Sequence, residues 1–104
     1  MKAIEKFLKV VANNEFVEGH EVLEEQWHLY KKCHDKENES KILKGLINAS
    51  TALALATKGK SEGAAKVWLT FEKYRPLLQT TACENLPLYK EAETLLDAKK
   101  HLFM

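Results

Sequence analysis

The chain has 104 residues, of which 45% are hydrophobic and 30% are charged. This size and composition predict one compact domain covering residues 1–104, with little room for a second domain or a large cleft. Sixteen lysines and arginines against fifteen acidic residues give a net charge of +1, a balance that creates no strong field and so argues against nucleic acid or a membrane surface as a partner.

The N-terminus and the cysteines indicate a reduced, cytoplasmic protein. Glu5, Lys6 and Lys9 interrupt the apolar stretch that a signal peptide would need. No run approaches the roughly 18 apolar residues that a membrane-spanning helix requires. The two cysteines, Cys33 and Cys83, lack the close repeated spacing of a zinc site, although one disulfide between them is arithmetically possible.

Apolar residues recur with a helical period along most of the chain, and no alternating strand pattern is present. A first helix is expected over residues 2–12, followed by Asn13-Asn14, which breaks it and can cap the next helix. The second helix is expected over residues 15–33. Its apolar stripe includes a histidine and consists of Phe16, His20, Leu23, Trp27 and Tyr30.

The third helix is expected over residues 40–58, after a polar loop at residues 35–39. Its faces are apolar or small, which lets neighbouring backbones approach closely, so it should be the central and most buried helix. The residues that support this position are Ile42, Leu43, Gly45, Leu46, Ile47, Ala49, Ala52, Leu53 and Ala56.

Two more helices complete the predicted fold. Gly59 ends the third helix, Ser61 is a good cap for a fourth, and Pro76 should kink or end that one. A fifth helix is expected over residues 87–102. Because the connections are short, neighbouring helices should be antiparallel, and the predicted fold class is all-α: a single up-and-down antiparallel bundle of four to five helices.

The second helix carries the one constellation that indicates chemistry. At about 100° per residue, His20 lies within the apolar stripe and Glu24 lies about 40° away, at the edge of the core. A carboxylate beside an inward imidazole can fix its tautomer, share a divalent metal ion with it, or form an acid–base pair. His20 and Glu24 are therefore the candidate catalytic residues and metal ligands, and a divalent metal ion is the possible cofactor.

Two interpretations of this pair remain open. In the first, it forms a metal or acid–base site that acts on an unknown small molecule, although a metal site needs three or four ligands and one helix supplies two. In the second, His20 is hydrogen-bonded to Glu24 or to a backbone group and only holds the helix in register. The protein is then a non-catalytic helical-hairpin interaction module that engages a protein or a second copy of itself, for example through Leu102-Phe103-Met104. Asn48 could hydrogen-bond into the His20 site or face water.

The motifs resemble those of the bacterial and archaeal family called domain of unknown function 309, over about residues 13–78. They are His20-Glu21-Val22-Leu23-Glu24-Glu25-Gln26-Trp27, then Gly45-Leu46-Ile47-Asn48 and Gly63-Ala64. The resemblance implies a helical bundle and a motif suspected of binding metal, without an established activity. It makes His20 and Glu24 the candidate ligands and Trp27 the wall beside them, with Glu21 and Asn48 as the other surrounding groups.

Three positions depart from the family pattern. Asn48 replaces the usual glutamine, Lys60 replaces an asparagine that is common in the turn, and Leu55 replaces a residue that is often histidine or aromatic. The change at Leu55 removes a possible third ligand or proton carrier, so it argues against catalysis more than against the fold.

Overall fold

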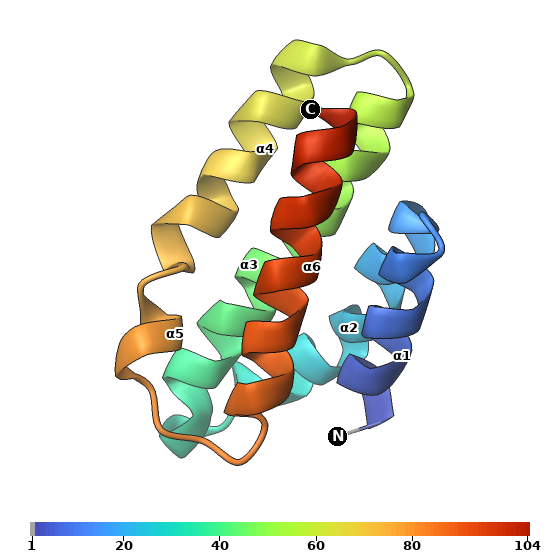
Figure 1. Cartoon of the computed structure of the whole chain (residues 1–104). Helices are drawn as coiled ribbons and strands as arrows, with labels where there is room; N and C mark the ends of the chain where they lie inside the picture. The colour runs from blue at the N-terminus through green and yellow to red at the C-terminus, as the bar shows by residue number, and fades with distance from the viewer. Residues whose placement is uncertain (1) are drawn as a thin grey trace.

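The computed structural model describes residues 2–104 and contains five long helices, one short helix and one 3-10 turn (Figure 1). The elements are α1 (Lys2–Ala12), α2 (Phe16–Tyr30), η1 (His34–Lys36), α3 (Glu37–Thr57), α4 (Ser61–Tyr74), α5 (Leu77–Thr80) and α6 (Leu86–Phe103). No strand occurs in this part of the chain, so the predicted all-α class is confirmed. Within it, no helix has the length and apolar character needed to cross a bilayer.

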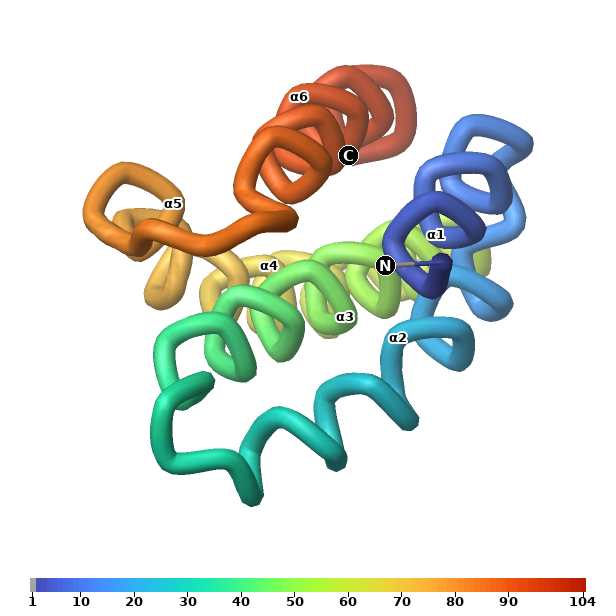
Figure 2. The backbone as a smooth tube through the Cα atoms, turned by 90° about the horizontal axis from the view of Figure 1, so that it is seen from below, coloured from blue at the N-terminus to red at the C-terminus, as the bar shows by residue number. Residues whose placement is uncertain are grey.

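The long helices run alternately up and down. In Figure 1, α1, α3 and α6 run in one direction, and α2 and α4 run in the other, so helices that follow one another are antiparallel. Helix α3 packs against both α2 and α4, and α6 bridges from α3 to α1 (Figure 2). Because the five long helices alternate in direction, the first and the last, α1 and α6, are parallel, and they also pack against each other.

Helix α3 is the centre of the bundle, as its small and apolar residues predicted. Its buried apolar side chains include Leu43, Leu46 and Leu53, none of which has any exposed surface. Their burial against α2, α4 and α6 supplies much of the hydrophobic stabilisation, at roughly 25 cal/mol per Å² of apolar surface removed from water.

The helix ends differ in part from the sequence prediction. Asn14 has a positive φ of 64° and turns the chain between α1 and α2, where we expected a side-chain cap. Gly59, with a φ of 79°, ends α3 as predicted, because glycine adopts this left-handed conformation without steric cost. Ser61 is the first residue of α4 and makes no capping hydrogen bond. Helix α4 ends before Pro76, as predicted.

The polar segment predicted as a loop instead contains η1 and the first turn of α3. Helix α3 begins at Glu37, and Glu39 also lies in its first turn, where a negative charge interacts favourably with the partial positive charge of the helix end. The Ser40 hydroxyl donates a hydrogen bond of 2.7 Å to the Glu37 carbonyl and satisfies one more polar group in this turn. Because α3 begins at Glu37 rather than at the predicted residue 40, Glu39 lies on a buried face of this helix.

Candidate functional site

The predicted site residues lie along one flank of α2. The buried face of this helix consists of Phe16, Gly19 and Leu23. His20, Glu24 and Trp27 are half-buried, at the border between that face and solvent. They therefore line an edge of the bundle rather than a dry interior, and we call them the α2 flank.

No hydrogen bond or ion pair joins His20 to Glu24, and neither side chain makes one with any other residue in the described part of the chain. The hydrogen-bonded pair that the sequence suggested is therefore not formed. The half-exposed position supplies the physical reason, because side chains at this border can hydrogen-bond to water and need no protein partner.

The surrounding residues take other partners or face solvent. The Trp27 ring has the Lys31 ammonium 4.5 Å from its centroid and the His28 ring centroid 4.7 Å away, and it also packs, partly buried, against the apolar core. The Asn48 amide donates a hydrogen bond of 2.8 Å to the carbonyl of Lys44, within α3. Glu21 is exposed. Of the expected surrounding groups, only Trp27 is half-buried beside His20 and Glu24 along α2.

The α2 flank contains two side chains of the kinds that ligate metals, His20 and Glu24. In residues 2–104, no three histidine, cysteine, aspartate or glutamate side chains lie close enough together to hold an ion. These described residues therefore do not by themselves build a closed structural zinc site or a three-ligand catalytic site. A metal site that used His20 and Glu24 would be open and would need its other ligands from outside the described residues.

A second polar region, which the sequence analysis missed, surrounds Glu39. This residue is only 5% exposed. Its carboxylate accepts hydrogen bonds from the Tyr89 hydroxyl and, over 3.3 Å, from the Asn85 amide, while the Lys36 ammonium lies 3.7 Å away. The first turn of α3 is thereby linked to the first turn of α6, some fifty residues later.

Burial shapes the titration of the groups around Glu39. It raises the pKa of Tyr89, and the hydrogen bond to Glu39 raises it further, so the phenol remains a proton donor. Burial and the Glu39 charge also raise the pKa of the Cys83 thiol, so less of it is present as the reactive thiolate. Beside Glu39 and Cys83 lies a surface cavity of about 330 Å³, lined mainly by polar residues.

A family model described as domain of unknown function (DUF309) matches residues 4–67, which is more than half of the chain. The chain belongs to the DUF309 family. No match was found among curated proteins or among solved structures. The DUF309 match runs from α1 into α4, so it contains the α2 flank and Glu39, whereas Tyr89 lies beyond it.

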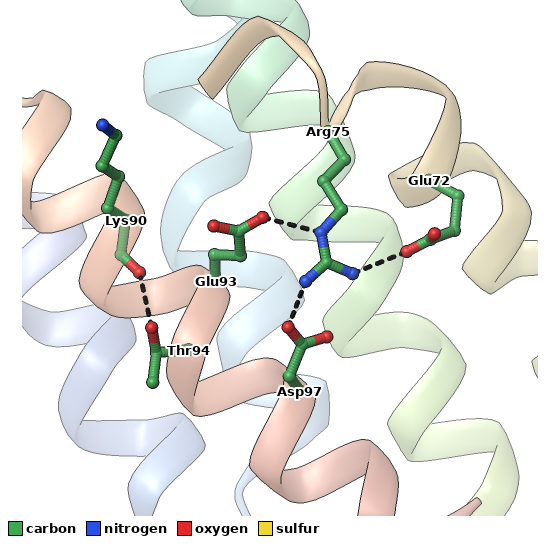
Figure 3. A network of polar contacts seen from close by, with 6 residues as sticks. All are labelled: Glu72, Arg75, Lys90, Glu93, Thr94 and Asp97. Carbon is green, nitrogen blue, oxygen red and sulfur yellow. Dashed lines mark hydrogen bonds and ion pairs between the residues drawn. The ribbon is translucent and has the colours of Figure 1, made fainter. Parts of the chain in front are cut away.

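The segment after the DUF309 match is attached by a second polar network, drawn in Figure 3. Arg75 donates hydrogen bonds to Glu93 over 2.6 Å and to Glu72 over 2.7 Å, and it also pairs with Asp97. Three carboxylates thus surround one guanidinium group and connect the end of α4 to α6. Because the guanidinium nitrogens are occupied within the chain, this network serves the fold.

Proposed function

We propose that this DUF309 protein binds a divalent cation through His20 and Glu24, with water, a small molecule or a partner completing the coordination. One observation carries the proposal: the two side chains share a half-exposed flank of α2 and have no hydrogen-bond or ion-pair partner in the described chain. Residues four apart on a helix are neighbours on its surface, so one ion can reach both side chains.

The chemistry expected at such a site follows from its openness. A cation held by two protein ligands keeps most of its coordination positions for water or substrate, and it supplies Lewis-acid polarisation there. His20 and Glu24 hold and orient the ion, and Trp27 provides an apolar surface on one side. Without an ion, the same groups can act as base and acid only on a substrate that reaches both of them, because no hydrogen bond connects them.

Metal titration of four proteins tests the proposal. We expect isothermal titration with Zn²⁺ or Mn²⁺ to give about one ion per chain in the wild type, no measurable binding in His20→Ala and at least about tenfold weaker binding in Glu24→Gln, since each ligand contributes a separate bond. His101→Ala is the matched control, because it removes an exposed imidazole from α6 and should leave binding unchanged. Equal binding by all four proteins, or none by the wild type, would contradict the assignment.

A second candidate function, the non-catalytic interaction module, is favoured by a different observation. The surface between α1 and α6 has an apolar groove of about 510 Å³, and near it Leu102 is 71% exposed. Exposed apolar surface of this kind commonly marks a protein interaction site. In this alternative the α2 flank has no role in binding an ion.

A further inference from the structure

The groove between α1 and α6 is lined by four apolar or small side chains and by Glu91 and Thr94. Leu8 and Ala12 of α1 and Leu95 and Ala98 of α6 line it. The two helices pack against each other and run in the same direction (Figure 2). The alanines keep the groove open, since neither fills the space between the helices. Leu102, one turn beyond Ala98, continues the apolar stripe to the end of α6.

The charge beside this groove reverses along its length. Glu91 of α6 lines the end of the groove where both helices begin, and Glu5 is exposed in the first turns of α1, so this end carries two acidic side chains. Near the other end are the exposed Lys9 of α1 and the half-buried Lys99 of α6, and the Lys99 ammonium donates a hydrogen bond of 3.1 Å to the Ala12 carbonyl. The groove is therefore apolar along its middle, acidic at one end and basic at the other.

We infer that this groove is the contact surface for a second copy of the chain, packed end for end about a two-fold axis. Such an axis brings the acidic end of each copy against the basic end of the other, while the apolar middles of the two grooves meet. In this orientation the second copy places its basic end opposite the acidic end of the first copy, and its acidic end opposite the basic end. This match in charge is our reason for proposing a second copy as the partner. The inference specifies the partner in the interaction-module alternative and does not depend on the metal site.

The expected dimer is weak. Helix α1 has 11 residues, so the two helices share only about 16 Å of length, at about 1.5 Å per residue. We expect a contact over so short a length to bury less than the roughly 800 Å² per partner of a standard interface. We therefore expect association that depends on concentration and, because the paired ends are charged, also on salt.

Sedimentation velocity over a range of protein concentrations, in the presence of a chelator, tests the inference separately from metal binding. The wild type should shift from monomer to dimer as its concentration rises. Ala98→Arg should remain monomeric, because a large charged side chain at this exposed position fills the groove without entering the core. A wild type that remains monomeric up to millimolar concentration would overturn the inference, whatever the metal titration gives.

Charge reversal then tests the end-for-end geometry. Glu91→Lys and Lys9→Glu should each weaken dimerisation at least about fivefold, because like charges then meet at the ends. Mixing the two single variants should restore dimers, because the lysine introduced at position 91 of one variant then faces the glutamate introduced at position 9 of the other, and the unchanged Lys9 and Glu91 face each other at the opposite end. If mixing restores nothing, the proposed packing is wrong. A Lys66→Glu variant, which changes an exposed lysine on α4, is the charge-matched control.

Discussion

The Glu39 region and the α2 flank both place ionisable side chains against apolar helices, but they differ in where their partners lie. Glu39 is buried, and Tyr89, Asn85 and Lys36 surround it within the chain. His20 and Glu24 are half-exposed and have no such partners in the described residues. Polar groups of the first kind stabilise the fold, and groups of the second kind remain available to bind something outside it.

The largest expected effect is a difference in the free energy of unfolding between variants of the Glu39 region and variants of the α2 flank. Glu39→Ala should lower the free energy of unfolding by about 3 kcal/mol, because the fully buried Tyr89 hydroxyl loses its acceptor. His20→Ala and Glu24→Ala should change it by less than about 0.5 kcal/mol. Urea unfolding of the three variants measures the difference. Similar losses in all three would show that the α2 flank also serves the fold, and Glu39→Gln, which keeps an acceptor, is the control.

The next effect tests how the start of α2 is held in place. A Cβ on Gly19 would overlap the Ser50 hydroxyl, which donates a hydrogen bond of 2.7 Å to the Phe16 carbonyl. Gly19→Ala should therefore cost about 2 kcal/mol through overpacking and displacement of that bond. Gly63→Ala is the matched control: its Cβ would lie 3.6 Å from Leu55 Cδ1, an ordinary contact, so the helix should gain about 0.5 kcal/mol. Equal effects in thermal unfolding would be inconsistent with this account.

The smallest expected effect is the contribution of Tyr89, in the Glu39 region, to the pH dependence of the free energy of unfolding. The pKa of Tyr89 in the folded protein is raised above its ordinary value of 10.0. Above pH 10 the unfolded chain loses this proton while the folded protein keeps it, so stability falls by up to about 1.4 kcal/mol per pH unit. Below pH 10 this contribution is constant. Tyr89→Phe should remove this part of the slope in urea unfolding between about pH 9 and 11; an unchanged slope would rule out Tyr89 as its source.

The helical architecture was predictable from sequence because the buried face of a helix produces a local pattern of apolar residues. Apolar residues spaced by three and four mark the faces of α1, α3 and α6, and Gly59 and Pro76 mark helix ends by their backbone restrictions. The start of α3 was not predictable by the same means. Glu37 and Glu39 are polar and resemble a loop, and their favourable placement depends on the helix end that they help to form.

The site was predictable only in part. Helical periodicity places His20 and Glu24 on neighbouring positions of α2, but it cannot say whether two side chains turn toward each other. Glu39 and Tyr89 lie fifty residues apart, and their pairing depends on which helices become neighbours. Once α3 is extended to Glu37, Glu39 lies three residues before the buried Ile42, and this spacing is the signal that could have identified it.

The apolar core does not stop where the family match does. Tyr89, Ala92 and Leu96 of α6 have no exposed surface, and they pack in the same cluster as Phe7 and Leu46 from the matched segment. A shortened chain cut at residue 67 would uncover that cluster and lose the helix that closes it. The segment matched by the family model is therefore shorter than the part of the chain that is needed to keep the apolar core out of water.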